Sequence, residues 1–434
     1  MDKMADVLGR AGAWCGQNKY LSAIKNAFQN FMPLTIAGAI GVLWCNVLVN
    51  DQTGLGLFFK PIMALDFLNP AFQAVNFCTI SCITVGITLG IAQEIGVWNM
   101  GAERAGYIPG LVGLAAWLSV TNTSHMVDGA KEAFTGVAGN ELGATGLFTG
   151  MIIGVLSVEL FCFFEKQDAL KIKMPEQVPP GVARAFEVLV PATITLIITA
   201  CIGSACYNLT GLYLNDVIKN GIQGPLGAVG ATIPGVMIIY LVIMLFWLVG
   251  IHGNNMLSAV KEALFTPLAL ENVEKFNKGE KPTNIINMYA LQMWGEFGGS
   301  GVTIGLVIAI MIFGKREDNK AIATLSLVPG LFNINETVTF GIPMVLNPIL
   351  GIPFVVAPLV TIIIGYVLTV IGFCPVACLT VPWTTPPIVF GFLATGANVM
   401  GAVTHAILIV VSTVIYVPFL ISYEKYQNKQ AAEA

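Results

Sequence analysis

The chain has 434 residues, of which 56% are hydrophobic and 11% are charged, and its mean hydropathy is +0.78. Soluble globular domains carry about 25% charged residues, so this composition excludes them and predicts an all-α, polytopic membrane protein. The net charge is −4, and no Walker loop or dinucleotide fingerprint occurs, so a nucleotide-driven pump is not supported and we expect no nucleic-acid partner.

The first half of the chain holds five apolar segments that are long enough to cross the bilayer as helices. They cover residues 31–49, 71–92, 106–123, 143–164 and 186–206. Glycines recur in two of them at four-residue spacing, which favours close helix packing. They are Gly86 with Gly90, and Gly146, Gly150 and Gly154. A polar connection follows at 207–232, and we predict that residues 1–212 form a scaffold domain.

The second half is less regular. Its clear spans cover 233–251, 349–373 and 400–422. Basic residues mark the cytoplasmic connections, and they gather before the first span, at 166–184, at 315–320 and after Tyr423. The charged run at 271–281 also looks cytoplasmic, so the apolar chain between it and residue 315 must cross twice or enter and leave on one side. Both termini are then expected in the cytoplasm.

Residues 321–348 cannot form a full span. The loop at 315–320 before them is expected in the cytoplasm, and the span at 349–373 after them must run outward so that the last span returns the chain to the cytoplasm. Prolines at 329, 343 and 348 break the segment, so we predict a re-entrant segment or a pair of half-spans. Broken helices near the membrane midplane are typical of a transporter's substrate site. We therefore predict that residues 213–434 form a substrate-binding transport domain.

Glu336 is the only Asp, Glu, Lys or Arg between Lys320 and Glu424. An ionised carboxylate at the centre of a membrane helix costs about 2.5 to 3.5 kcal/mol, so we expect Glu336 to face protein or a cavity and to have a function. A structural alternative is a capping box, in which Asn333 starts a half-helix and Glu336 reaches back to its amide.

His252 ends an apolar span in the sequence "WLVGIHGNN". Gly250 and Gly253 allow a ligand to approach the backbone, and Asn254 and Asn255 add amide donors and acceptors. His252 is therefore a candidate for a functional residue that titrates near neutral pH. A hydrogen-bonded packing role is the alternative.

Amides, a carboxylate and aromatic rings in otherwise apolar helices suggest a sugar site, since a sugar has hydroxyl groups at its edge and apolar C–H faces. They are Asn76, Gln292, Trp294, Glu296 and Trp383. Each is also explained by a hydrogen bond between helices or by a position at the membrane interface. No His and Cys cluster or C-x-x-C pair occurs, so we expect no metal and no cofactor.

Four segments carry a resemblance to a known family. They are "NKYLSAIKNAFQNFMPLTIAGAI" near the start, "GIHGNN" around His252, "FNINETVTFGIP" at 332–343 and "VPWTTPP" at 381–387. They resemble enzyme IIC, the membrane component of the bacterial phosphoenolpyruvate-dependent sugar phosphotransferase system. The resemblance is to its lactose, cellobiose and diacetylchitobiose branch, and it covers essentially the whole chain.

The resemblance implies about ten transmembrane helices, two re-entrant hairpins and amphipathic connecting helices in a homodimer of the bacterial cell membrane, with the N-terminal half mediating dimerisation. It implies uptake of a disaccharide that is phosphorylated at its 6-hydroxyl by a phosphocysteine on a cytoplasmic enzyme IIB, expected here as a separate protein. The family's essential His and Glu correspond to His252 and Glu336. The remaining predicted sugar ligands are Asn76, Asn254, Asn255, Gln292, Glu296, Asn333, Asn335 and Trp383.

Two other functional classes stay open at this stage. In an ion-coupled secondary permease, Glu336 or His252 would bind the coupling proton and the sugar would arrive unmodified. A signalling or scaffold protein would bind no sugar at all. An elevator-type movement of the second half against the first is a further expectation for the sugar transporter.

Overall fold

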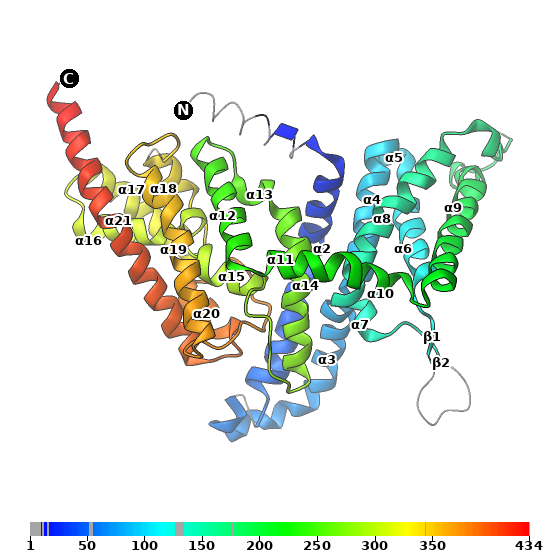
Figure 1. Ribbon diagram of the computed structural model, residues 1–434, viewed down its shortest axis with the longest axis horizontal. Coiled ribbons are helices and arrows are strands. Elements are labelled where there is room, and N and C mark those ends of the chain that lie inside the picture. The colour runs from blue at the N-terminus through cyan, green and yellow to red at the C-terminus, as the bar shows by residue number, and fades with distance from the viewer. Residues whose placement is uncertain are drawn as a thin grey trace. The chain divides into compact units, whose positions relative to one another are not determined.

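The computed structural model describes residues 10, 13–14, 17–51, 55–125, 134–175, 177–342 and 344–433. Most of them form helices, and the single pair of strands in this part of the chain is short and antiparallel, with β1 (Ser124–His125) beside β2 (Phe134–Thr135) (Figure 1). The predicted all-α class is confirmed. Pro343, one of the predicted helix breaks, lies outside the described residues.

The described chain divides into two compact units, each with its own packing. Unit 1 comprises Met1–Gly16, Ala39–Gln73 and Ala228–Ala434, and unit 2 comprises Gln17–Gly38 and Ala74–Gly227. The long first helix, α2 (Lys19–Leu43), contributes to both. The roles predicted for residues 1–212 and 213–434 stay predictions.

Unit 2 is built around four helices that pack closely. They are α4 (Ile83–Met100), α6 (Ile108–Val120), α8 (Ala144–Glu165) and α9 (Pro180–Thr210). Glycine permits the close approach: a Cβ at Gly150 would lie 2.2 Å from the hydroxyl oxygen of Thr88, and one at Gly113 would lie 2.3 Å from the Cβ of Ala92. Trp117 is fully buried in the resulting core. The small-residue packing predicted for this half is thus present between α4 and α8.

Shorter elements complete the first half of the chain. They are η1 (Trp44–Leu48), η2 (Leu55–Leu57), η3 (Lys60–Leu68), α3 (Asn69–Cys78), η4 (Ile80–Cys82), α5 (Ala102–Ala105), α7 (Gly139–Leu142), η5 (Asp168–Leu170), α10 (Leu214–Ile218), η6 (Lys219–Gln223) and α11 (Gly224–Gly230).

The C-terminal part of unit 1 combines long apolar helices with short, interrupted ones. They are α12 (Ile233–Leu248), α13 (Gly253–Met256), α14 (Ser258–Asn277), α15 (Met288–Gly295), η7 (Ser300–Val302), α16 (Ile304–Phe313), α17 (Glu317–Leu331), α18 (Glu336–Gly341), α19 (Gly351–Val370), α20 (Pro387–Ala394) and α21 (Val399–Glu433). The last helix packs against α16, α19 and α20 (Figure 1).

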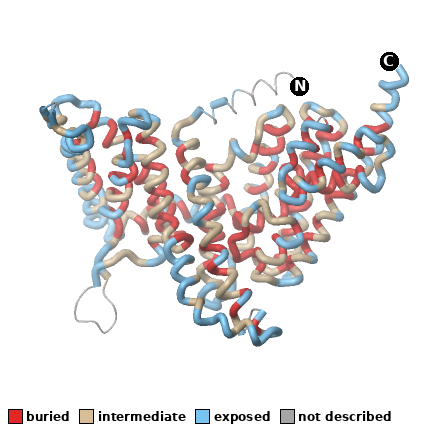
Figure 2. The backbone as a smooth tube through the Cα atoms, turned by 180° about the vertical axis from the view of Figure 1, so that it is seen from behind, coloured by how far each residue is buried: buried red, intermediate tan, exposed pale blue. Residues whose placement is uncertain are grey.

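Six helices of the described chain are long and apolar enough to cross a membrane, or seven if one bent pair forms a single span. They are Lys19–Leu48, Lys60–Met100, Ala144–Glu165, Pro180–Thr210, Gly351–Val370 and Val399–Glu433, with the pair Met288–Val302 and Ile304–Phe313. Apolar helices Ile108–Val120 and Ile233–Leu248 are shorter. The count of about ten stays a prediction. Buried and exposed residues alternate along these helices (Figure 2).

Residues 321–348 fold as predicted for two half-helices. Helix α17 ends at Leu331, and α18 begins at Glu336 after a break. The carboxylate of Glu424 on α21 holds the start of α17, because it accepts hydrogen bonds from the backbone N–H groups of Lys315 (2.9 Å) and Arg316 (3.3 Å). Beyond α18, the N–H of Leu346 donates to the carbonyl of Leu248 at the end of α12 (2.8 Å). The segment is therefore fixed at both ends.

The apolar chain between residues 281 and 315 is also interrupted. Its helices α15 and α16 meet at an angle of 59° across the short turn of η7. Gly298 and Gly299 precede η7 with φ of +67° and +86°, a region that residues with a Cβ rarely adopt. The bend agrees with the prediction that this stretch does not form one straight span.

Candidate functional site

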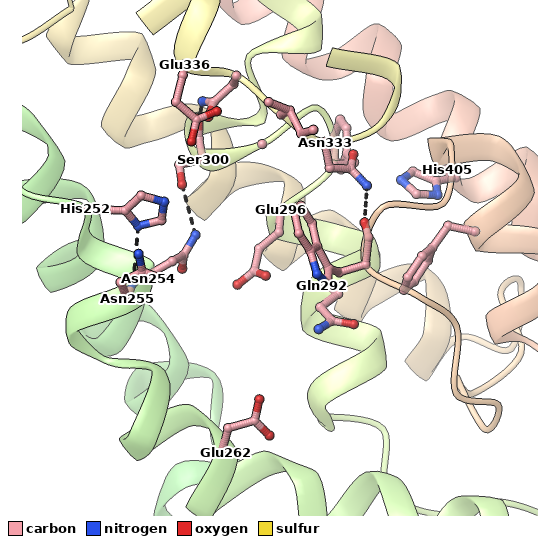
Figure 3. A pocket seen from close by; sticks show the side chains of 16 residues that line it. His252, Asn254, Asn255, Glu262, Gln292, Glu296, Ser300, Asn333, Glu336 and His405 are labelled. Carbon is pink, nitrogen blue, oxygen red and sulfur yellow. Dashed lines mark hydrogen bonds between the residues drawn. The ribbon is translucent and has the colours of Figure 1, made fainter. Parts of the chain in front are cut away.

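A cavity of about 270 Å³ lies within unit 1, in the region where its interrupted helices meet (Figure 3). Every site residue predicted from the sequence lines it except Asn76, which lies on α3, and Trp294, which lies on α15. The predicted residues in its wall are His252, Asn254, Asn255, Gln292, Glu296, Asn333, Asn335, Glu336 and Trp383. Residues 252 to 383 thus contribute to one surface although they come from four separate parts of the sequence.

His252 starts the short helix α13 and is oriented by two contacts. Its Nδ1 accepts a hydrogen bond from the backbone N–H of Asn255 (3.3 Å), and its ring packs on Trp247 with 4.4 Å between ring centroids. Because Nδ1 is the acceptor, the neutral ring carries its proton on Nε2. The ring can thus donate one hydrogen bond into the cavity.

Glu336 is the first residue of α18 and faces the cavity on the same side as His252 (Figure 3). It is exposed, and it makes no hydrogen bond or ion pair with any other described residue. The carboxylate is therefore available to a ligand. Its position in a cavity wall agrees with the expectation from its isolation in the sequence.

The capping-box interpretation of Asn333 and Glu336 is wrong. Asn333 has a left-handed backbone (φ +63°), and the cap position of α18 is occupied by Asn335, which makes no side-chain cap. The side chain of Asn333 instead accepts a hydrogen bond from the N–H of Gly298 (2.6 Å) and donates to the carbonyls of Trp383 and Thr385. One amide thus connects three segments of the cavity wall.

A buried ion pair supports the centre of the cavity. Lys261 of α14 pairs with Glu296, and their side chains are 7% and 18% exposed. The hydroxyl of Tyr240 donates to the same carboxylate (2.7 Å), and Lys261 also reaches the carbonyl oxygen of the Asn254 amide (3.4 Å). The Asn254 amide nitrogen donates in turn to the hydroxyl of Ser300 (2.9 Å). Glu296 therefore has its charge balanced within the protein.

The remaining predicted residues differ in how much of their hydrogen-bonding capacity is free. Asn335 donates to the carbonyl of Ser300 (2.7 Å) and is buried. The side-chain amide of Gln292 makes no hydrogen bond within the described chain, and Trp383 is 44% exposed. Gln292 and Trp383 are thus open to a ligand, whereas Asn335 mainly holds the turn at Ser300.

The cavity also contains residues that the sequence analysis missed. They are Glu262, Phe297, Gly299, Ser300, Ile334, Phe390 and His405. His405 could have been found, because it is a polar residue inside an apolar span, the criterion applied to Asn76. It is 1% exposed, packs edge-on against Phe297 (5.1 Å between ring centroids), and neither ring nitrogen has a hydrogen-bond partner in the described chain.

Comparisons with known proteins identify the family and agree with the fold. Residues 25–358 match the family model for the phosphotransferase system EIIC component. The chain is 32% identical over 429 residues to the oligo-beta-mannoside-specific EIIC component of Bacillus subtilis, covering 98% of this chain and 94% of that protein. It is 30% identical over 486 residues to the cellobiose-specific EIIC component of Lactococcus lactis, covering 98% of each.

A solved structure is similar over nearly the whole length. It is the crystal structure of the transporter ChbC, the IIC component from the N,N'-diacetylchitobiose-specific phosphotransferase system. The TM-score is 0.88 at 30% sequence identity, and the alignment covers 97% of both chains. The family model matches well over half of the sequence. The cavity described above contains His252 and Glu336, the two residues that the resemblance marked. The chain therefore belongs to the EIIC family of the phosphotransferase system, whose members are multi-pass sugar permeases of the cell membrane.

Proposed function

We propose that this permease takes up a disaccharide and presents its 6-hydroxyl for phosphorylation by a separate phosphocysteine enzyme IIB. The observation that carries this proposal is that the imidazole of His252 and the unpaired carboxylate of Glu336 face one cavity, together with free amides and an exposed indole ring. The names of the similar EIIC components, which specify cellobiose and oligo-beta-mannosides, support a β-linked substrate.

In the proposed transfer, the 6-hydroxyl lies between Glu336 and His252. The hydroxyl oxygen forms a bond to phosphorus while the S–P bond of the phosphocysteine breaks, and the thiolate of enzyme IIB leaves. Glu336 accepts the hydroxyl proton, and the N–H at Nε2 of His252 donates a hydrogen bond to the attacking oxygen. Phosphoryl transfer depends mainly on such positioning and electrostatics, so the permease forms no covalent intermediate.

The rest of the wall binds the sugar body. Trp383 covers the apolar face of a ring, and Gln292 and Asn255 offer hydrogen bonds to ring hydroxyls. Asn254, Asn333 and Asn335 already make hydrogen bonds within the protein. We therefore propose that they mainly stabilise the cavity wall and contact the sugar only through donors and acceptors that these bonds leave free. For Asn76, a contact with the rim of the sugar stays a prediction.

The wider organisation is part of the same proposal. The permease works as a homodimer with both termini in the cytoplasm, residues 1–212 mediating dimerisation. Residues 213–434 carry the sugar across in an elevator-type movement. The interrupted helices around the cavity support this division, since broken helices are typical of the mobile substrate-holding part of a transporter.

Purified protein in lipid vesicles tests the proposal. Radiolabelled cellobiose outside and phosphorylated enzyme IIB inside should yield cellobiose 6-phosphate in the lumen, and unphosphorylated enzyme IIB should yield none. An ion-coupled permease would instead accumulate unmodified cellobiose on a proton gradient without enzyme IIB. Accumulation of unmodified sugar would contradict group translocation.

A further inference from the structure

Glu262 is a second acid in the cavity wall without an ion pair. Its carboxyl group lines the cavity, and the hydroxyl of Thr266 donates a hydrogen bond to its Oε2. The other oxygen makes no hydrogen bond within the described residues, and no salt bridge there includes Glu262. The adjacent cation, Lys261, is already engaged by Glu296 and Asn254. One oxygen of Glu262 is therefore left for a partner that is not part of the chain.

The position of Glu262 separates it from the phosphorylation site. It projects from α14, whereas Glu336 and His252 belong to α18 and the start of α13. In the close view, Glu262 lies on the opposite side of the cavity from Glu336, with Gln292 and Glu296 between them (Figure 3). If the 6-hydroxyl of one ring lies at Glu336, Glu262 on the opposite side is a candidate to contact the other ring.

A carboxyl oxygen that has no hydrogen-bond partner in the protein can accept a hydrogen bond from a donor on a ligand. Sugar hydroxyls are such donors, and a hydrogen bond to a charged acceptor is about twice as strong as one between neutral groups. We propose that Glu262 is a specificity-determining residue that accepts a hydrogen bond from the ring that is not phosphorylated. This inference rests on the proposed function, because it needs the phosphorylated ring at His252 and Glu336.

The structure then explains selection for length. A single ring fills the end at Glu336 and leaves Glu262 unpaired, whereas a disaccharide satisfies both acids. Glu262 also discriminates against a second ring whose hydroxyls are methylated, since an ether oxygen cannot donate. The site thus favours disaccharides with free hydroxyls on the distal ring.

This role is tested by measuring the equilibrium binding of sugars to the purified protein in detergent. The two probes are radiolabelled cellobiose, which has two rings, and methyl β-glucoside as a competitor, which has one. Glu262→Gln should weaken cellobiose binding about tenfold, while the competing affinity of methyl β-glucoside stays within about twofold. A purely structural role would change both affinities together.

The matched control is Glu274→Gln, on the same helix but exposed and paired with Lys278. It should change neither affinity. Thr266→Val keeps the acid and removes the hydroxyl that orients it, so it should weaken cellobiose binding by a smaller factor if Glu262→Gln does not fold. Unchanged cellobiose binding in both cavity variants, or an equal loss for both probes, would overturn the inference. A wild-type protein that binds neither probe would contradict the proposed function instead.

Discussion

Glu336 is the residue on which the proposed proton transfer depends. Glu336→Gln keeps the size of the side chain and removes the base, so sugar phosphorylation should fall by about 10²- to 10⁴-fold. The fold should survive, because the carboxylate is exposed and unpaired. Formation of sugar phosphate by vesicles with phosphorylated enzyme IIB measures the first effect, and thermal unfolding in detergent measures the second.

A surface acid provides the comparison for this variant. Glu317→Gln removes a carboxylate that is 87% exposed at the start of α17, and it should leave phosphorylation at the wild-type rate. Normal sugar-phosphate production by Glu336→Gln would rule out Glu336 as the base and would leave it only a sugar ligand.

The buried pair of Lys261 and Glu296 makes a separate prediction about stability. Lys261→Met leaves the carboxylate of Glu296 buried without its cation, and removing one partner of a buried pair typically costs about 3 to 5 kcal/mol. The melting temperature should therefore fall clearly. The double variant Lys261→Met with Glu296→Gln should recover part of the loss, since no charge is then left unpaired. A single variant that melts at the wild-type temperature would show that the pair does not support the fold.

At the scale of elements, Asn333 joins the turn between α15 and η7, the broken segment and the loop before α20. Asn333→Gly allows the left-handed backbone conformation without strain and removes only the side-chain hydrogen bonds. Asn333→Ala removes the same hydrogen bonds and also adds backbone strain of about 1 kcal/mol or more. Both variants should lower kcat/KM for sugar phosphorylation, and Asn333→Ala should melt at a lower temperature than Asn333→Gly. Equal melting temperatures would mean that the backbone conformation of Asn333 adjusts freely.

The sequence predicted the broken segment correctly and its internal geometry wrongly, for physical reasons. The cytoplasmic loop before residues 321–348 and the outward span after them require that this segment does not cross the membrane as a single span, and its prolines locate the interruption. The spacing of Asn333 and Glu336 suits a capping box, but spacing is a local property. It cannot reveal that the N–H of Gly298 and the carbonyl of Thr385 approach Asn333 in the fold and compete for its amide.

The candidate site shows the same limit at single residues. Glu336 and His252 stand out because their neighbours in the sequence are uncharged. Glu262 follows Lys261 in a helix with many charges, and a solvated helix has the same pattern, so no sequence signal separates it from a surface acid. Phe297 and Phe390 are apolar residues in an apolar chain, and only the tertiary fold shows that they line a cavity.

At the scale of the whole molecule, the elevator-type proposal predicts how the parts move. Residues 233–422 should shift as one body against the first half during each transport cycle. Disulfide crosslinks between paired cysteines, one in each half, should therefore stop uptake and release it again after reduction. Each crosslinked pair is compared with its two single-cysteine variants under oxidising conditions. Uptake at the wild-type rate with several such crosslinks intact would contradict a rigid-body movement.

The charge distribution of the cavity bears on what happens after phosphorylation. Glu262, Glu296 and Glu336 line its wall, and among the described residues Lys261 is the single Lys or Arg that pairs with them. A neutral sugar enters such a site without electrostatic cost. If phosphoryl transfer takes place there, the product gains a phosphate of nearly two negative charges, and this phosphate and Glu336 repel each other once Glu336 has released the proton that it accepted. The same carboxylates that hold the sugar would then favour release of its phosphate from the cavity.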